Sequence, residues 1–213
     1  MQTVYFVRHG ESEGNIGDVW QDSTASLTKH GRAQAGLLAD RLAGFPIDVV
    51  ISSDMKRALQ TADIVADRIK TKVEHSELFN ERRRPSEQLG ELKANERAKD
   101  AELQIKTYFN NPEFRYSDEE NFCDLKKRAE ELVDFLEGRE EKHILVVTHE
   151  ILMRIILAYI AMGDDLTGEE GKQFFRTFHM ENTGITTITQ NEGDNKSRWD
   201  LQTWNDYSHL GKL

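Results

Sequence analysis

The chain of 213 residues contains a single cysteine, Cys123, and only three prolines. One cysteine excludes an internal disulfide framework and is compatible with a reducing compartment. No apolar run reaches transmembrane length, because the longest candidate, 151–162, is interrupted by Arg154. The first residues also lack the basic region of a signal peptide. We therefore predict a cytoplasmic protein that has no membrane partner.

Positive charge is scarce as well, since 28 Lys and Arg against 38 Asp and Glu give a formal net charge of -10. This balance argues against a general nucleic-acid-binding protein and against binding to anionic membranes. An anionic substrate would need a local basic pocket on this acidic background. Internal repeats and Pro/Gly/Ser-rich linkers are lacking too, which predicts a single domain over residues 1–213.

Apolar segments of strand-like composition alternate along the chain with amphipathic segments of helical period. The predicted strands cover 3–7, 48–53, 72–75, 144–149, 185–189 and 199–204, with a hairpin loop at 191–196. The predicted helices cover 28–42, 54–69, about 92–109, 122–136 and 151–162. This order predicts an α/β fold, a three-layer sandwich in which a mostly parallel central sheet is flanked by helices.

Residues 86–121 interrupt this alternation with a polar, irregular pattern. Helical character is confined to about 92–109 and ends at the Asn110-Asn111-Pro112 break. We interpret this section as an inserted segment of helix and loop that lies over the open end of the sheet and the active site. A mobile cap and simple surface decoration are both compatible with the sequence.

Three predicted strands lead into side chains suited to binding phosphate. Arg8 and His9 follow the first strand, Arg57 comes soon after the second, and His149 ends the fourth. Parallel strands place their carboxyl ends at one edge of a sheet, so these side chains could converge there. The arginine fork pairs two phosphate oxygens and stays charged. The combination favours attack on a phosphoryl group, although each residue alone could be a solvated or structural side chain.

The opening motif, Val4–Asn15 (VYFVRHGESEGN), resembles the signature of the histidine phosphatase superfamily, the phosphoglycerate-mutase-like proteins. Later blocks are similar to that family in the same order: Leu27-Thr28 with Gly31, Gln34 and Ala35, then 52–62 (SSDMKRALQTA), then 146–149 (VVTH). The resemblance covers nearly the whole chain outside the section between Pro85 and Asn121. It implies a phosphohistidine mechanism that requires no metal and no cofactor.

Carried over residue by residue, the resemblance implies that His9 is the nucleophile and forms the phosphohistidine. His9 must be neutral to attack, and the nearby Arg8 and Arg57 would disfavour its cationic form. Arg8, Arg57 and His149 would hold the phosphoryl oxygens, with Asn15 as a further donor.

Glu81, the last residue of 78–81 (LFNE), falls where the family places its general acid. That acid protonates the leaving oxygen and later activates water. Because Glu74, Glu77 and Glu87 lie nearby in sequence, an ordinary solvated carboxylate is the competing interpretation of Glu81.

Two departures from the family pattern bear on the substrate. The run 82–85 (RRRP) replaces a glycine-bearing segment, and we predict that Arg83 contacts a second anionic group of the substrate. A surface run that balances nearby glutamates is an equal alternative. Glu150 follows the second histidine, where many relatives have glycine, and we count it among the substrate-binding residues. The segment 149–159 also resembles the fructose-2,6-bisphosphatase branch, which favours sugar phosphates.

The sequence therefore predicts a phosphatase that hydrolyses small phosphomonoesters, sugar phosphates among them. The chain lacks the long insertion expected of cofactor-dependent phosphoglycerate mutases, which favours a phosphatase over a mutase. A mutase that keeps the phosphoryl group and a catalytically silent relative that binds a phosphorylated ligand are the alternatives. The predicted partner is a small phosphorylated metabolite, and the oligomeric state stays open.

Overall fold

The computed structural model describes residues 1–190 and 199–211, so the predicted hairpin loop at 191–196 lies outside the described residues. The strands are β1 (Thr3–Arg8), β2 (Val49–Ser52), β3 (Val73–His75), β4 (His143–Thr148), β5 (Ile185–Gln190) and β6 (Trp199–Asp206). The α-helices are α1 (Glu13–Ile16), α2 (Lys29–Leu42), α3 (Lys56–Ile69), α4 (Glu96–Thr107), α5 (Phe122–Glu137), α6 (Glu150–Met162) and α7 (Gly168–Thr177).

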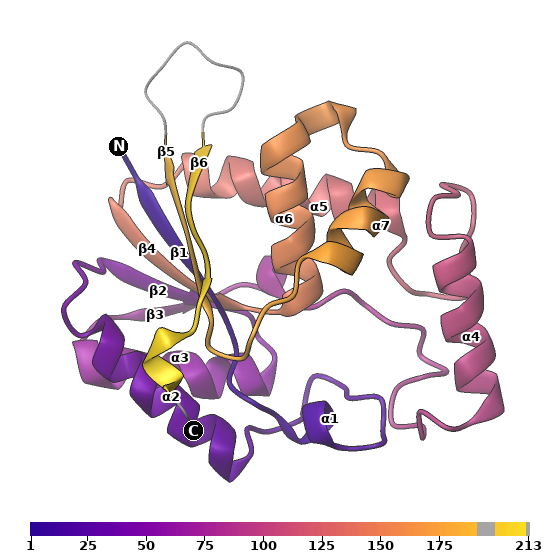
Figure 1. The fold of residues 1–213 in the computed structure, drawn as a ribbon, viewed down its shortest axis with the longest axis horizontal. Coiled ribbons are helices and arrows are strands. Elements are labelled where there is room, and N and C mark those ends of the chain that lie inside the picture. Colours follow the sequence, from indigo (N-terminus) through magenta and orange to yellow (C-terminus); the bar gives the residue numbers. More distant parts are fainter. Residues whose placement is uncertain (191–198, 212–213) are drawn as a thin grey trace.

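The six strands form one sheet in the order β3-β2-β4-β1-β5-β6. The β3–β2, β2–β4 and β4–β1 pairings are parallel, whereas β5 runs antiparallel to β1 and β6 antiparallel to β5. Helices α2 and α3 cover one face of the sheet, and α5, α6 and α7 lie on the other (Figure 1). The predicted mostly parallel α/β sandwich is confirmed.

The central strands are buried on both faces, which explains their unbroken apolar runs. In β1, Val4 and Phe6 pack into the core beneath α5 and α6, while Tyr5 and Val7 pack into the core beside α2 and α3. Strand β4 alternates in the same way. Each fully buried side chain of this size contributes about 1.5–3 kcal/mol of transfer free energy. The strand ends that carry the site are therefore anchored in the two most apolar layers of the molecule.

Helix starts follow the capping rules in part. As predicted, Thr28 caps α2 by accepting a hydrogen bond from Gly31 N. The prediction that a helix begins at Asp54 is wrong by two residues, because α3 starts at Lys56. The backbone N–H of Asp54 donates to the Asn80 side chain, which holds this residue outside the helix.

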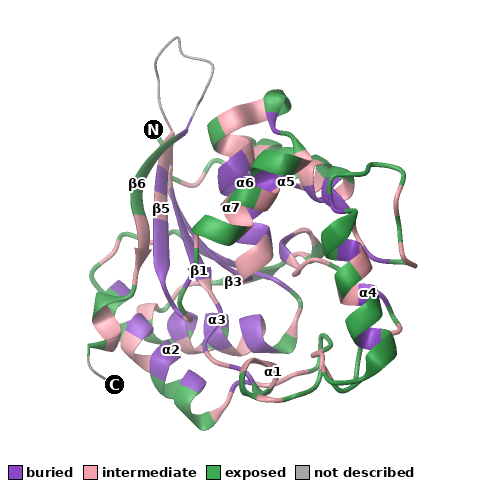
Figure 2. Cartoon of the chain, turned by 45° about the vertical axis from the view of Figure 1, so that its right-hand side comes forward, coloured by how far each residue is buried: buried purple, intermediate pink, exposed green. Residues whose placement is uncertain are grey.

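The inserted segment stands to one side of the sheet layers (Figure 1), and Figure 2 shows most of α4 exposed. Helix α4 is shorter than predicted and buries only Ala98, Ala101 and Ile105. The segment rests on the loop after α1, because Val19 forms a bridge with Leu92 and Lys93 Nζ donates to the carbonyl of Gly17 at 2.7 Å. None of the helices in the described ranges combines the length and apolarity needed to span a bilayer.

Candidate active site

Two histidines from different sequence blocks meet at the carboxyl edge of the sheet. Strands β1 and β4 pair with Arg8 opposite Thr148, so the residues that follow them, His9 and His149, are neighbours. Their ring centroids lie 5.0 Å apart. Arg57, in the first turn of α3, joins them because its Nε lies 3.2 Å from His9 Nε2. These three predicted side chains are thus brought together, and all are buried.

The hydrogen bonds of His9 define its tautomer. Its Nδ1 lies 2.7 Å from the Gly10 carbonyl oxygen, which can only accept, so Nδ1 carries the proton. The Nε2 atom accepts from the Nε–H of Arg57 and therefore holds the lone pair. Burial, followed by the charges of Arg57 and Arg8, holds the pKa of His9 well below its usual value. His9 is neutral, with the nucleophilic lone pair on Nε2.

The turn after β1 requires a glycine at position 10. A Cβ atom there would lie 2.5 Å from the Gly31 carbonyl oxygen of α2. The Gly10 N–H donates to Thr61 Oγ1 of α3 at 3.1 Å. Gly10 therefore allows both helices to approach the loop that presents His9.

A chain of hydrogen bonds also fixes the tautomer of His149. The Asn80 side-chain oxygen accepts from the Asp54 N–H at 3.0 Å and from Ser53 Oγ at 2.7 Å. Since Ser53 donates its only hydroxyl proton there, it accepts from the Nε2–H of His149 at 2.8 Å. The buried Nδ1 of His149 has no partner in the described residues. Burial lowers the pKa of His149 well below its usual value, so this atom is a bare lone pair until a ligand anion favours its protonation.

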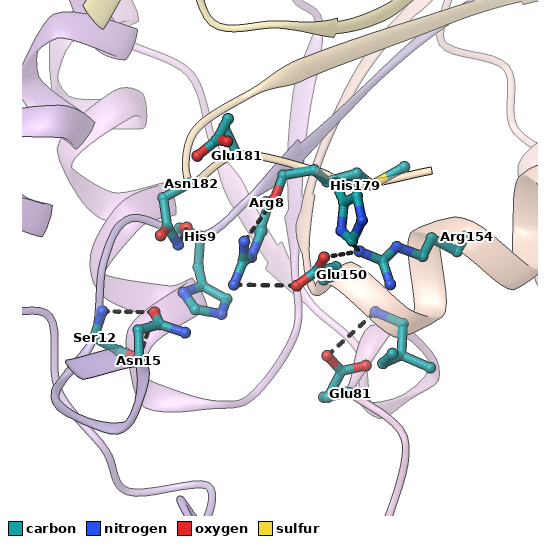
Figure 3. Close-up of polar contacts among 12 residues, drawn as sticks. Arg8, His9, Ser12, Asn15, Glu81, Glu150, Arg154, His179, Glu181 and Asn182 are labelled. Carbon is teal, nitrogen blue, oxygen red and sulfur yellow. Dashed lines mark hydrogen bonds and ion pairs between the residues drawn. The ribbon is translucent and has the colours of Figure 1, made fainter. Parts of the chain in front are cut away.

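Arg8 is held by groups from the far end of the chain (Figure 3). Its Nη1 donates to the Met180 carbonyl at 2.6 Å, and its Nη2 lies 3.3 Å from a carboxylate oxygen of Glu150. Glu150 also forms a short ion pair with Arg154. The Glu150 carboxylate is therefore occupied by two cations and orients Arg8. Its predicted contact with substrate stays a prediction.

Asn15 has one face of its amide fixed and the other unused. Its side-chain oxygen accepts from the N–H and the hydroxyl of Ser12, each at 2.9 Å (Figure 3). The amide nitrogen has no partner within the described ranges. Asn15 is therefore oriented as a donor, and its predicted contact with a phosphoryl oxygen remains to be tested.

Glu81 is anchored to the first turn of α6 rather than left in solvent. Its carboxylate accepts from the backbone N–H groups of Arg82, Ile151 and Leu152 at 2.9, 3.3 and 3.2 Å. Figure 3 shows Glu81 near the start of this helix. Because α6 begins directly after His149, the predicted general acid lies on the same helix start as the second histidine.

A cavity of about 430 Å³ opens beside this cluster. Arg57 and Glu81 lie in its wall on the sheet side, while Arg82, Arg83 and Arg84 line the opposite side. The volume is that of a small-metabolite site. His9, only 2% exposed, lies behind Arg57. A phosphoryl group that enters must therefore displace the Arg57 contact at His9 Nε2.

Several supporting residues were not found from the sequence. They are Ser53, Asn80, Met180, Asn182, whose side chain donates to the His9 carbonyl at 2.7 Å, and Thr183, whose N–H donates to the Arg8 carbonyl. The segment between α7 and β5 carries no local signal, because its role depends on folding back onto the end of β1. No group of three or more His, Cys, Asp or Glu side chains in the described part of the chain could hold a metal ion.

Comparison with known proteins identifies relatives along the whole chain. The family model described as the histidine phosphatase superfamily (branch 1) matches residues 4–207. The "Probable phosphoglycerate mutase GpmB" of Proteus mirabilis (strain HI4320) is 29% identical over 217 residues, which cover 99% of this chain and 95% of that protein.

Two solved structures share the fold. YhfR of Bacillus stearothermophilus superposes with a TM-score of 0.82 at 24% identity, covering 99% of this chain and 100% of that one. A mutant phosphoserine phosphatase from Entamoeba histolytica, in complex with phosphoserine, gives a TM-score of 0.78 at 24% identity, with coverage of 99% and 100%.

Proposed function

Because the chain belongs to the histidine phosphatase superfamily (branch 1), we propose that it hydrolyses small phosphomonoesters through a phosphohistidine intermediate on His9. The observation that carries this proposal is the state of His9, a buried neutral imidazole whose Nε2 lone pair faces the Arg57 guanidinium. A neutral nucleophile beside a fixed cation suits an anionic phosphoryl group. A small phosphorylated metabolite as substrate and a cytoplasmic location remain predictions from the sequence.

In the first step, His9 Nε2 attacks phosphorus while the bond to the leaving ester oxygen breaks. Glu81, in its acid form, gives its proton to that oxygen. Arg8, Arg57 and the Asn15 amide hold the phosphoryl oxygens. Phosphorylation makes the imidazole ring cationic, and the Gly10 carbonyl at Nδ1 stabilises that charge. One difficult displacement is thereby divided into two easier ones.

In the second step, the Glu81 carboxylate accepts a proton from water, and the water oxygen attacks phosphorus. The P–N bond breaks, its electron pair returns to Nε2, and inorganic phosphate leaves. His9 is neutral again, and Glu81 carries the proton for the next cycle. The three backbone N–H groups that hold Glu81 keep one carboxyl group in place for both transfers.

Phosphate release from a panel of phosphorylated metabolites tests this proposal. We expect release by the wild type, with a loss of at least about 10³-fold in His9→Ala because the nucleophile is absent. His75→Ala, which changes an exposed histidine, is the matched control. Acid-labile phosphate should become bound to the wild-type protein during turnover, and to the His9→Ala variant not at all.

The alternatives give different results in the same assay. A mutase, suggested by the name of the Proteus mirabilis relative, would isomerise a phosphoglycerate and depend on a bisphosphate primer. A silent relative would bind phosphate without turnover. No release from any substrate, with His9→Ala indistinguishable from the wild type, would overturn the proposed hydrolysis.

A further inference from the structure

Arg82 lines the cavity with an unpaired guanidinium. Its backbone N–H donates to Glu81 at 2.9 Å, but within residues 1–190 and 199–211 its side chain makes no hydrogen bond or ion pair. Its nitrogens are not sealed from the cavity, since they are absent from the buried unpaired atoms. Burial lowers the pKa of Arg82, which shows that the charge is partly desolvated. A desolvated cation without a partner is costly unless an anion binds it.

The adjacent arginines are already engaged. Arg83 donates through Nε to the Asp118 carbonyl at 2.5 Å and is largely exposed. Arg84 pairs with Glu102 at 2.9 Å, and its guanidinium stacks 4.0 Å above the Trp20 ring. Both side chains therefore tie the inserted segment to the body of the protein. Arg82 differs from them in having its charge free.

The carboxylates closest to Arg82 are also committed elsewhere. Glu102, Glu81 and Glu120 each raise the pKa of Arg82 by their charge, so they lie near it. Glu102 is held by the ion pair described above, Glu81 by three backbone N–H groups, and Glu120 by Arg128 at 2.8 Å. No side-chain anion of the described chain is therefore left to neutralise Arg82.

We propose that Arg82 is a specificity-determining residue that binds a second anionic group of the substrate, carried on the same small skeleton as the phosphoryl group attacked by His9. The planar fork of Arg82 would hold a carboxylate or a second phosphate through two N–H groups. Arg82 follows Glu81 in the chain and shares a hydrogen bond with it, so its position relative to the general acid is fixed. The assignment rests on the proposed function for the phosphoryl end only.

A matched pair of substrates isolates this contact. Glycerol 3-phosphate and 3-phosphoglycerate share a skeleton and differ in a hydroxymethyl group against a carboxylate, and glycerol 1,3-bisphosphate adds the second phosphate instead. The readout is kcat/KM for each dianionic-skeleton substrate divided by kcat/KM for glycerol 3-phosphate. We expect Arg82→Gln to lower this ratio at least about tenfold, through KM, because a charge-assisted bond is lost. Arg82→Lys should restore part of the ratio.

Arg83→Gln is the control, because the sequence alone had assigned the second anion to Arg83. We expect its ratio to stay within about threefold of the wild type. A ratio that falls in Arg83→Gln but not in Arg82→Gln would overturn the assignment, as would an equal loss for all three substrates. The arm whose ratio falls further identifies the anion as carboxylate or phosphate.

A binding measurement separates this proposal from the proposed hydrolysis. Titration calorimetry of the same three compounds on His9→Ala, with and without Arg82→Gln, gives a ratio of Kd values that needs no turnover. A ratio that depends on Arg82 in a protein that releases no phosphate would refute the hydrolysis and support the binding site. Active protein with a ratio independent of Arg82 would do the reverse.

Discussion

The two walls of the cavity are built in different ways. The sheet-side wall carries Arg57 on α3, behind which His9 and His149 follow adjacent parallel strands whose apolar residues fill the core. The opposite wall is a loop and an inserted segment, held by ion pairs and one stacked arginine. The first wall cannot shift without disrupting the core, whereas the second depends on a few polar contacts.

This difference separates the two tasks of the site. Groups that act on phosphorus need fixed geometry, and the strand ends supply it. Groups that recognise the rest of a substrate can lie on loops, where changes cost little stability. We therefore expect substitutions in the sheet-side wall to affect the chemistry, and those in the inserted wall to affect substrate choice or local stability.

Removing one arginine from each wall would break this comparison if it is wrong. Arg57→Gln should lower kcat for p-nitrophenyl phosphate by about 10²- to 10³-fold, because a preorganised donor to the developing charge is lost. Arg84→Gln, which removes a cavity-lining arginine of the other wall, should change kcat less than about threefold. Steady-state kinetics on the two variants measure both. Equal losses would show that the two walls do not divide the work.

The buried histidines of the sheet-side wall make stability depend on pH. The pKa values of His9 and His149 are well below 6.5 in the folded protein, so below about pH 6.5 the unfolded chain takes up protons that the folded state does not. The free energy of unfolding should therefore fall as pH decreases below about 6.5. The slope is at most about 1.4 kcal/mol per pH unit for each histidine.

Urea unfolding at pH 7.5, 6.5 and 5.5 measures this slope. The double variant His9→Gln, His149→Gln should show a shallower dependence than the wild type. His209, whose pKa burial also lowers, is present in both proteins and cancels in the comparison. Parallel curves for the two proteins would mean that the site histidines do not titrate as their burial implies.

The smallest effect is expected where the inserted wall is anchored. Trp20→Leu removes the ring beneath Arg84, a contact worth about 0.5–1 kcal/mol. We expect faster amide hydrogen exchange in α4, with exchange in β1 and β4 unchanged, because α4 opens locally. Acceleration throughout the protein would instead place this contact in the global core.

The sequence predicted the sheet-side wall well because its signals are local and repeated. Apolar runs set the strands, Thr28 capped its helix as expected, and the strand ends brought His9 and His149 together. Helix α7 was missed although Thr167 and Glu170 form a capping box at its start. That signal was available from the sequence.

The inserted wall could not be resolved from the sequence in the same way. Arg82, Arg83 and Arg84 have the same chemistry, and only their tertiary contacts distinguish them. Likewise, nothing local indicates that Ser53 orients His149, because Asn80, which determines the direction of that hydrogen bond, arrives from another segment. Long-range polar contacts set these details.

The anchoring of Glu81 to the N-terminus of α6 has a consequence for how such a site can change. The proton donor takes its alignment from a core helix, not from the loop that carries it, so the chain beyond Glu81 is free of that duty. Residues after position 82 can be exchanged, lengthened or shortened to suit another metabolite while acid and nucleophile keep their registration.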